Sequence, residues 1–331
     1  MIILNIIQDS PRIFSIETYK KELKTPFFFP AVSTVKTNFK PLEYIDLIRK
    51  VEFPGYLVSA YDIYKLEDKT KKELLKKVSE STENGIFTYL DSGNYESYWH
   101  NDKTWNITQM ETILTEISVD FCFSYDVFWK NQKIEDYVKE SITFIAKTGG
   151  IQKSGTTVPI VHSTPDLLPK IIRKIVDGIN PEIISVPERE LGYSIFERAK
   201  TVKEIRDELN KSKYPIPLHL LGTGNPISIL VYSVCGADMY DGLEWCKNVV
   251  NPDTGHLFHF VQKDLIDCNC KACKSKDTLY PFKTMAHNLN FYEFFLRNIR
   301  ESFKENNFDD ILEQYLSKEK SLQIKKIAGL K

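Results

Sequence analysis

The stretch VPIVHSTPDLLPKIIRKIVDGINPEIISVPE, residues 158–188, contains one complete unit of a pattern in which strands and helices alternate. Its two ends, 158–163 and 182–188, are short and largely apolar, as expected of strands buried on both faces of a parallel sheet. The segment between them, 165–179, has apolar residues at helical spacing. A strand, a helix and a second strand in this order predict a βαβ unit with parallel strands.

The same alternation extends over most of the chain. Eight short apolar runs have the length and composition of buried strands: 27–32, 55–60, 86–91, 121–126, 158–163, 182–188, 216–222 and 237–241. Further amphipathic helical patterns occupy 67–80, 134–147 and 196–210. Eight strands alternating with helices predict an α/β fold, a (β/α)8 TIM barrel formed by one domain over residues 1–331, with a doubly wound open sheet as the alternative.

Composition and charge limit the class of protein. The 331 residues are 42% hydrophobic, enough for a large core. The 44 basic and 45 acidic residues nearly cancel, so any surface that binds nucleic acid must be a local patch. The amino-terminal stretch 1–14 lacks the basic flank and cleavage site of a signal peptide. Because no apolar run approaches the roughly 18 to 20 residues of a membrane helix, we expect a cytoplasmic protein.

Several of the eight runs end on a polar residue: Asp91, Asp126, His162, Glu188 and Asp241. In a barrel the carboxyl ends of the strands meet at one mouth, where active sites are built. One acidic residue after a strand is more often a helix cap or a turn residue. Three aspartates in corresponding places instead favour a site for nucleophilic or acid–base chemistry, since apolar surroundings raise carboxylate pKa values.

A cluster of metal-binding residue types lies towards the end of the chain. It comprises three cysteines and one histidine: Cys268, Cys270, Cys273 and His287. This set matches a tetrahedral site for structural Zn2+, and four protein ligands leave no open position for a reactive water. A redox pair is the less favoured alternative. The remaining cysteines are scattered and are expected to be buried apolar residues: Cys122, Cys235 and Cys246.

His287 is predicted to begin a long amphipathic helix, which the metal would fix to the cysteine-bearing loop. His256 and His259 are alternative fourth ligands, ranked lower because their surroundings are strand-like. We therefore predict a small zinc-binding insertion over residues 250–290.

Taken together, several segments resemble the tRNA-guanine transglycosylase family. The likeness covers residues 25–303 and is carried by an ordered set of segments: TPFFFPAVSTVK (25–36), YLDSGNYES (89–97), FCFSYDVF (121–128), LHLLGTGNP (218–226), GADMYD (236–241), CNCKAC (268–273) and HNLNFYEFFLRNIRESF (287–303). The resemblance implies a (β/α)8 barrel with a zinc-bound subdomain that exchanges guanine for a 7-deazaguanine base.

The resemblance also implies roles for single residues. Asp241 falls on the family's nucleophile, which attacks C1′ of the target nucleoside and forms a covalent intermediate. Asp91 falls on the aspartate that binds the base and acts as general acid/base. The remaining implied substrate-binding residues are Ser92, Tyr95, Asp126, His162, Glu188, Leu221 and Gly222. Among these, Asp126 is a second base-recognition carboxylate, while Tyr95 and Leu221 would enclose a base that has been flipped out of its stack.

Some positions depart from the family's pattern. His162 stands where glutamine is usual, Asn94 replaces a glycine, and ISVPERELG (184–192) replaces a Gly-Gly segment, so that Glu188 or its backbone would contact the base. The segment 242–256 contains no arginine and only Lys247, where bacterial tRNA enzymes carry an anticodon-reading loop. The Cys273–His287 spacing is short, and no RNA-binding module follows.

These departures favour the branch of the superfamily that inserts a 7-deazaguanine such as preQ0 (7-cyano-7-deazaguanine) into DNA. The alternative substrate is tRNA, and a homodimer is possible because the zinc region mediates dimers in relatives. Two further alternatives are a non-catalytic partner subunit, which retention of the three aspartates disfavours, and a metal-dependent hydrolase. The hydrolase would need metal ligands at the mouth, where only His162 is suitable.

Overall fold

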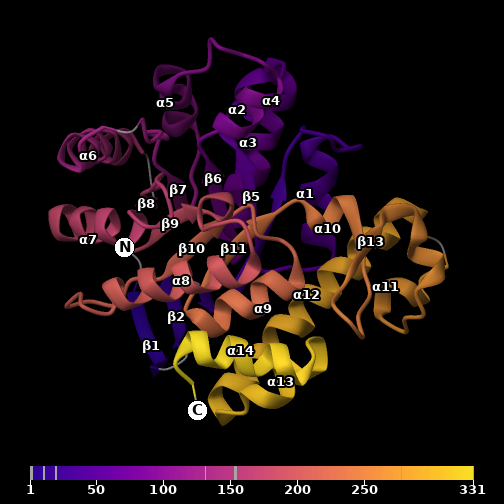
Figure 1. Ribbon diagram of the computed structural model, residues 1–331. Helices are drawn as coiled ribbons and strands as arrows, with labels where there is room; N and C mark the ends of the chain where they lie inside the picture. Colours follow the sequence, from indigo (N-terminus) through magenta and orange to yellow (C-terminus); the bar gives the residue numbers. More distant parts are fainter. Residues whose placement is uncertain are drawn as a thin grey trace.

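The computed structural model describes residues 3–9, 12–18, 21–130, 132–152, 155–276 and 278–330. Its gaps fall partly within the stretches 1–14 and 250–290 considered above. Eight parallel strands form the centre of the molecule, and helices surround them (Figure 1). The strands are β4 (Phe27–Val32), β5 (Gly55–Ser59), β6 (Phe87–Asp91), β7 (Phe121–Phe123), β8 (Thr156–Val158), β9 (Ile184–Pro187), β10 (Leu218–Leu221) and β11 (Met239–Gly242).

The strands close into a barrel in chain order. Each strand from β4 to β8 pairs with the next, β9 to β11 do the same, and β11 pairs back with β4. The ring closes between β8 and β9 through the residues after β8, where Ile160 bridges Ser185. The Ser185 N–H donates to the Pro159 carbonyl and the Val161 N–H donates to the Ser185 carbonyl, both at 2.9 Å. The (β/α)8 prediction is confirmed, and the open-sheet alternative is wrong.

Two of the predicted strand ranges require correction. The strand predicted at 158–163 ends at Val158, because Pro159 has no N–H to continue the ladder. The strand predicted at 121–126 ends at Phe123, so Asp126 lies on the loop that follows. Asp126 and His162 therefore lie on the loops that follow these strands, and their side chains line the cavity at the mouth of the barrel.

Among the helices described around the barrel, four lie close to the patterns predicted at 67–80, 134–147, 165–179 and 196–210, whereas no helix was predicted for the others. The helices are α1 (Pro41–Lys50), α2 (Ala60–Lys65), α3 (Asp68–Glu83), α4 (Asn94–Trp99), α5 (Ile107–Glu116), α6 (Ile134–Ile151), α7 (Leu168–Ile179), α8 (Ile195–Leu209) and α9 (Pro226–Cys235). Helix α7 shows why the opening stretch forms a βαβ unit. Its apolar stripe, which includes Leu168, Ile172 and Val176, is the buried face of the helix.

Aromatic rings fill the inside of the barrel. Phe29 contacts Tyr89 edge to face at 5.4 Å between ring centroids, and Phe121 and Phe123 pack on Tyr89. His219 lies among them, with its ring parallel to that of Phe29. The floor of the mouth is therefore closely packed and apolar. Its low dielectric constant strengthens the electrostatic interactions of the polar groups above it.

A three-stranded antiparallel sheet covers the amino-terminal end of the barrel. It consists of β1 (Ile3–Asp9), β2 (Arg12–Thr18) and β3 (Lys21–Lys24). The Lys21 ammonium donates to the Ile86 carbonyl and to the Asp120 carboxylate, at 2.8 and 2.7 Å, at the start of β6 and β7. This sheet was not predicted, because its central strand is buried without regular alternation of apolar and polar residues.

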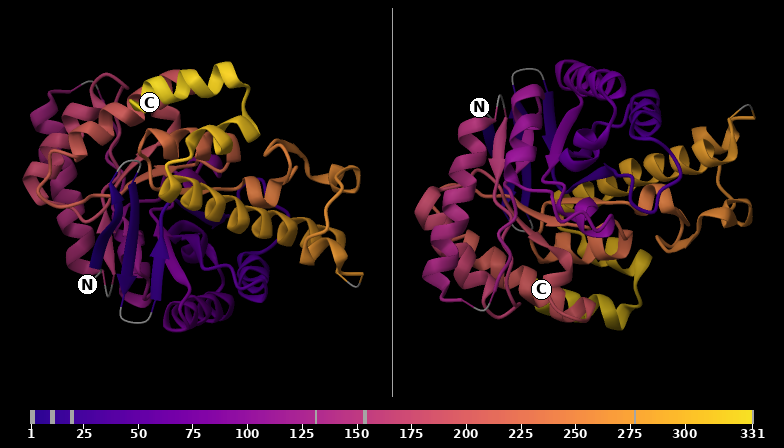
Figure 2. Two further views of the ribbon diagram at one scale, coloured as in Figure 1. Left: turned by 90° about the horizontal axis from the view of Figure 1, so that it is seen from below. Right: turned by 90° about the horizontal axis from the view of Figure 1, so that it is seen from above.

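The carboxyl-terminal part adds a projecting segment and a helical layer. The segment contains α10 (Glu244–Lys247), β12 (Asn248–Val250), β13 (Leu257–His259), the 3-10 helix η2 (Phe260–Leu265), α11 (Lys271–Lys274) and the first turns of α12 (Tyr280–Glu305). Figure 2 shows that its later part, from β13 to the first turns of α12, extends away from the barrel, whereas α10 packs on the barrel, with Trp245 Nε1 donating to the Ala31 carbonyl at 2.9 Å. The helices α13 (Phe308–Tyr315) and α14 (Lys318–Ala328) follow, and α14 packs on α8 and α9. Among the described residues, no helix is both long and apolar enough to cross a membrane.

Candidate active site and metal cluster

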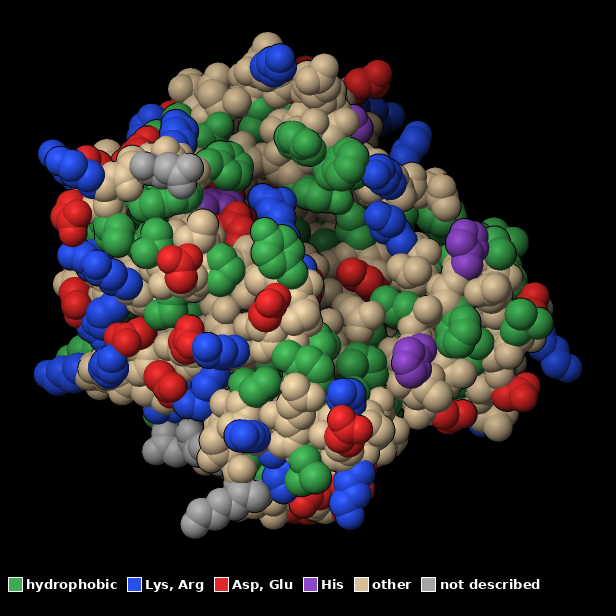
Figure 3. Space-filling model, viewed as in Figure 1, with side chains coloured by type: hydrophobic (Ala, Val, Ile, Leu, Met, Phe, Trp, Pro, Cys, Tyr) green, Lys and Arg blue, Asp and Glu red, His purple; other side chains and the backbone are tan. Residues whose placement is uncertain are grey.

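A cavity of about 810 Å³ lies at the carboxyl ends of the barrel strands. The polar residues that end the predicted strands all line it: Asp91, Asp126, His162, Glu188 and Asp241. The other predicted base-contacting residues line it too: Ser92, Tyr95, Leu221 and Gly222. Figure 3 shows the hollow, with hydrophobic side chains along its upper rim and basic side chains beside it. The structure thus brings together every predicted residue of the mouth.

Asp241, on β11, is held by two donors. Its Oδ1 lies 2.9 Å from His219 Nε2, and its Oδ2 lies 3.4 Å from the Gly222 N–H. Gly222 adopts φ +73°, a conformation that glycine reaches without strain. His219 is fully buried and its Nδ1 has no partner among the described residues. Nε2 therefore carries the proton and donates it to Asp241.

His219 was not predicted as a site residue. It occurs two positions before Leu221 on β10, so both side chains point to the same side of the strand. This alternation is the signal by which His219 could have been found, because Leu221 was already assigned to the mouth.

Asp91, at the end of β6, accepts a hydrogen bond from the Gly93 N–H at 2.9 Å. Gly93 has φ +83°, and a Cβ there would lie 2.5 Å from the Tyr61 Cβ, so this turn requires glycine. Burial raises the pKa of Asp91 well above its ordinary value, and the charges of Glu96 and Asp126 raise it further. The raised pKa favours the protonated form of Asp91, which can donate a proton to a bound molecule.

Glu96 is a buried carboxyl group of the mouth that was not predicted. Its two oxygens accept from the hydroxyls of Ser33 and Ser59, at 2.7 and 2.8 Å. Burial, followed by the charge of Asp62, raises the pKa of Glu96 to about 7. Glu96 therefore titrates near neutral pH within the same group of carboxyls as Asp91.

Asp126 is the centre of a hydrogen-bonded network. Its Oδ2 accepts from the Ser92 hydroxyl and the Asn94 amide, and its Oδ1 accepts from His162 Nε2 at 2.9 Å. The other ring nitrogen of His162, Nδ1, lies 2.7 Å from Glu190 Oε1. His162 thus links two carboxylates, and both of its nitrogens are protonated donors.

The charges in this network depend on one another. Burial alone would lower the pKa of His162, but the hydrogen bonds and charges of Asp126 and Glu190 outweigh it and raise the pKa to about 9. Burial would raise the pKa of Asp126, yet hydrogen bonding to His162 lowers it below its ordinary value. His162 was predicted to touch the base, whereas in the structure its polar atoms are already bonded, and Glu190 was missed.

The His162 network predicts a pH dependence of stability. Because the folded-state pKa of about 9 exceeds the ordinary value of 6.5, the stabilisation is complete below about pH 6.5 and is lost as the pH rises through about 9. We expect the difference in free energy of unfolding between wild type and His162→Gln to shrink by roughly 3 kcal/mol between pH 6 and 10. Urea unfolding at several pH values measures it.

The matched variant is Glu190→Gln, which keeps a hydrogen-bond acceptor for Nδ1 but removes one charge. We expect its stability to fall by less than that of wild type as the pH rises above about 6.5, and to stop falling at a lower pH, because the pKa of His162 is then raised less. A stability difference that does not depend on pH in either variant would contradict a protonated His162.

Glu188 lies on the 3-10 helix η1 (Glu188–Glu190) and is held by other protein groups. Its Oε1 accepts from the Tyr232 hydroxyl and pairs with Arg198, both at 2.9 Å. Glu188 lines the cavity as predicted. Its carboxylate is nevertheless fixed and partly neutralised by Arg198, which limits how far it can turn towards a ligand.

Besides His219 Nδ1, two further buried polar atoms near the mouth lack a partner among the described residues, Thr223 Oγ1 and Glu244 Oε2. Burial raises the pKa of Glu244 to about 7, and the charges of Glu188 and Asp241 add to the effect. A Cβ on Gly224 or Gly242 would lie within 2.3 Å of this oxygen, so the two glycines make room for it. Glu244 was not predicted, and it supplies the mouth with a further hydrogen-bonding group.

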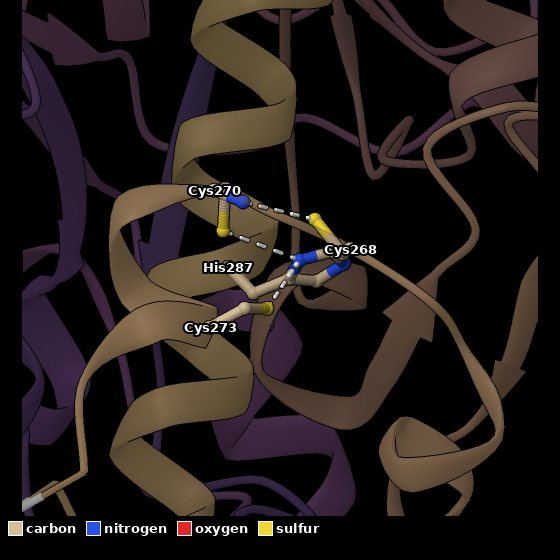
Figure 4. Close-up of side chains that lie close together, drawn as sticks. All are labelled: Cys268, Cys270, Cys273 and His287. Carbon is tan, nitrogen blue, oxygen red and sulfur yellow. Dashed lines mark hydrogen bonds between the residues drawn. The ribbon is translucent and has the colours of Figure 1, made fainter.

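The predicted metal ligands come together outside the mouth. The ligand atoms of Cys268, Cys270, Cys273 and His287 all lie within 4.8 Å of one another and can hold a metal ion. Figure 4 shows the four side chains pointing towards one another, with His287 projecting from α12. His287 Nδ1 faces the sulfurs of Cys270 and Cys273 at 3.7 and 3.4 Å.

The second ring nitrogen of His287 is fixed by the backbone. Nε2 lies 2.9 Å from the Val250 carbonyl, which can only accept, so Nδ1 carries the free lone pair that a metal needs. The neighbouring Asn288 bonds to Trp245, Asn248 and Val250, which ties α12 to β12. The arrangement fits a metal that holds the cysteine loop against this helix.

One detail of the metal prediction requires correction, the residue at which the helix begins. His287 does not begin its helix, because α12 starts at Tyr280 and His287 lies two turns further along. Pro281 in the first turn and the apolar residues before His287 extend the helix backwards. His256 and His259 are not part of the cluster, and the His259 side chain caps η2 instead.

Comparison with known proteins gives distant but extensive similarity. No protein-family model matches the chain. The chain is 20% identical over 317 residues to the tRNA-guanine(15) transglycosylase of Thermococcus onnurineus, covering 89% of this chain and 53% of that protein. It is 23% identical over 329 residues to the protein of the same name from Methanosphaera stadtmanae, covering 91% and 46%.

A third relative is the queuine tRNA-ribosyltransferase of Buchnera aphidicola, 26% identical over 156 residues, or 39% of this chain and 41% of that protein. The chain thus spans about half the length of the curated relatives it matches. The eight-stranded parallel barrel, the three aspartates at its mouth and the metal cluster agree with the segments that carry the resemblance. Together with these matches, they support membership of the tRNA-guanine transglycosylase superfamily.

Proposed function

We propose that the chain is a glycosyltransferase that exchanges a guanine in nucleic acid for a 7-deazaguanine base. The observation that carries the proposal is that Asp91, Asp126 and Asp241 line one cavity. Its volume of about 810 Å³ lies within the range of small-molecule sites. The names of the relatives, which are tRNA-guanine transglycosylases and queuine tRNA-ribosyltransferases, support the same reaction class.

In the first displacement, an Asp241 oxygen attacks C1′ of the target nucleoside. The bond between C1′ and N9 breaks, and its electron pair leaves with the guanine while a glycosyl–aspartate ester forms. The hydrogen bonds from His219 and Gly222 hold the Asp241 carboxylate in one orientation during the attack. Asp91, whose raised pKa favours the protonated form, gives its proton to the departing base.

In the second displacement, the 7-deazaguanine takes the place of guanine. Asp91, now a carboxylate, accepts the proton from N9 of the incoming base, and N9 attacks C1′. The ester bond to Asp241 breaks, which restores the free carboxylate. Two displacements through one carboxylate retain the configuration at C1′, as in retaining glycosidases. No proton or electron is gained or lost over the cycle.

Recognition of the base is assigned to the network around Asp126. An ionised carboxylate has about four acceptor positions, and Ser92, Asn94 and His162 occupy three of those of Asp126. One position remains for an N–H of the guanine edge. Tyr95 and Leu221, which line the cavity, are proposed to enclose the ring faces of the base, with Ser92, Gly222 and Glu188 at its edges.

We propose that the metal of the cysteine cluster is Zn2+ and that it is structural. Three thiolates and one imidazole form the usual closed tetrahedral shell of structural zinc. The Val250 carbonyl provides the outer hydrogen bond that orients a histidine ligand. The four ligands are not among the residues that line the cavity, so the ion would stabilise the 250–290 insertion rather than take part in the exchange.

We propose DNA as the nucleic acid, although the relatives are named for tRNA. The support lies in residues that differ from the tRNA enzymes. His162 is engaged by two carboxylates. The segment 184–192 contains the end of the barrel strand β9 and the 3-10 helix η1, whose carboxylates Glu188 and Glu190 bind protein groups. The segment 242–256 contains no arginine.

Incubation of the protein with labelled preQ0 and either DNA or tRNA separates the substrates. We expect label in DNA and none in tRNA, with no incorporation by Asp241→Asn in either arm. Label in tRNA alone would contradict the DNA proposal and leave the exchange reaction intact. Absence of label from both, in protein that binds preQ0, would contradict the exchange reaction and favour a non-catalytic partner subunit.

A further inference from the structure

Large aromatic side chains are exposed along one part of the cavity rim. Helix α4 carries three of them, Tyr95, Tyr98 and Trp99, and all three line the cavity. Tyr98 is 77% exposed and Trp99 is 47% exposed. The Trp99 ring meets the Tyr98 and Tyr95 rings edge to face, at 5.7 and 6.3 Å. Contiguous exposed apolar rings at a cavity mark a binding surface rather than a structural core.

A lysine lies directly on this surface. The Lys36 ammonium is 3.7 Å from the centroid of the Trp99 ring, which is a close cation–π contact. Lys36 follows β4 and adopts φ 52°, a backbone conformation that costs energy for a residue other than glycine. Among the described residues it makes no ion pair, so its charge is available to a ligand.

Three basic residues line the cavity itself, Lys247 on α10, Arg189 on η1 and Arg198 on α8, and Arg198 is paired with Glu188. Exposed aromatic rings interleaved with cations are the combination by which proteins hold unpaired nucleic acid strands, with bases stacked on rings and phosphates near the cations. A partner protein or a lipid surface would not require stacking faces and cations around a site for a single base. The charge and the ring geometry therefore favour a polynucleotide strand.

We propose that Tyr98 and Trp99 form a stacking platform for an unpaired nucleotide next to the target, and that Lys36 and Lys247 contact the adjoining phosphates. The inference rests on the proposed function, because it places a strand across the mouth. A target base can enter the cavity only after leaving its stack, which exposes the faces of its neighbours. The platform recovers that lost stacking, and it accepts any base because every base has a flat face.

The stacking is measured by titrating short single-stranded oligonucleotides that contain one guanine and following tryptophan fluorescence and affinity. We expect Trp99→Ala to weaken binding roughly 5- to 150-fold and Tyr98→Ala to weaken it by less. Trp99→Phe restores most of the affinity, since a ring remains. DNA and RNA oligonucleotides of the same sequence are compared, and a larger loss for one of them identifies the preferred strand.

An abasic nucleotide locates the contact. When the base beside the guanine is removed, the affinity of wild type is expected to fall by the same factor as on Trp99→Ala. The affinity of Trp99→Ala itself is expected to fall no further. The matched control is Tyr214→Ala, which removes a 53% exposed ring that also carries a lysine, Lys213, at 5.3 Å. Tyr214 precedes β10, at the opposite end of the barrel, so this change should leave the affinity unaltered.

The outcome is independent of the exchange chemistry. We expect Asp241→Asn to bind the oligonucleotides as wild type does, and Trp99→Ala to bind free preQ0 as wild type does. The platform is wrong if Trp99→Ala binds oligonucleotides with wild-type affinity. It is also wrong if Trp99→Ala lowers the affinity for intact and for abasic oligonucleotides by the same factor. Failure of exchange in wild type with oligonucleotide binding through Trp99 retained would contradict the proposed function and uphold the platform.

Discussion

Asp241→Asn is expected to lower the rate of base exchange by on the order of 10⁴- to 10⁶-fold, because it removes the attacking carboxylate. Asparagine has nearly the same shape, and its carbonyl oxygen can still accept from His219 Nε2. Only the longer 3.4 Å contact with the Gly222 N–H is given up, so the mouth should keep its geometry. The loss is therefore expected in the rate, while thermal stability and binding of preQ0 change little. Release of labelled guanine from nucleic acid measures the exchange.

The matched control is Asp253→Asn, an exposed change of the same chemistry in the turn between β12 and β13. It should leave the rate unchanged. An Asp241→Asn protein that exchanges guanine within tenfold of wild type would show that another group attacks C1′. A variant that loses both exchange and cooperative unfolding would be replaced by Asp241→Glu, which keeps the charge and moves it by one methylene; we expect Asp241→Glu to fold but to remain strongly impaired.

Cys270→Ser is expected to lower the metal content and the thermal stability together. A protein that loses a structural metal ligand is destabilised by about 4 kcal/mol or more, which corresponds to a fall in Tm of roughly 10 °C for a chain of this size. The reason is that the cysteine loop and α12 lose their common attachment point at His287. Metal analysis of the purified protein and a thermal melt measure the two effects.

Cys235→Ala is the matched control, because it removes a thiol that lies buried in α9 and outside the cluster. It should reduce stability by packing alone and leave the metal content unchanged. Wild-type protein that contains no zinc yet has the same Tm before and after treatment with a chelator would contradict a structural zinc site. Release of metal that stops exchange without changing the Tm would contradict the separation of metal and chemistry.

The sequence predicted the barrel because its strands are short apolar runs and helical patterns lie between several of them. The unit from Val158 to Glu188 shows this directly, since β9 and α7 lie where their patterns predict them. The amino-terminal sheet was missed because its strands are stabilised by distant partners, such as Lys21 with Asp120. A single sequence does not show contacts of that range.

The mouth was predicted as a set of residues but not as a network. Their position at the end of an apolar run identified Asp91, Asp126 and Asp241, since this feature depends on local sequence. The pairing of His162 with Glu190 and of Asp241 with His219 depends on how loops cross the mouth. Those contacts determine which side chains still have free donors and acceptors, and they change His162 from an expected base contact into a positioning residue for Asp126.

The start of the metal-bearing helix was placed too late for a related reason. Helical periodicity predicted a helix from His287 onwards and indicated no helix in the turns before it. Tyr280 and Pro281 begin the helix in the structure, and the Tyr280 hydroxyl accepts from the Lys263 N–H at 3.0 Å. Such contacts with the preceding segment cannot be read from helical periodicity.

The central claim is that Asp241 forms a covalent bond to the nucleic acid. It is tested most directly by incubating the protein with guanine-containing DNA or tRNA in the absence of preQ0, denaturing it, and analysing its peptides by mass spectrometry. We predict an adduct on the peptide that contains Asp241, which disappears when preQ0 is added and is absent from Asp241→Asn. Exchange without any adduct, or an adduct on Asp91 or another residue, would contradict the account.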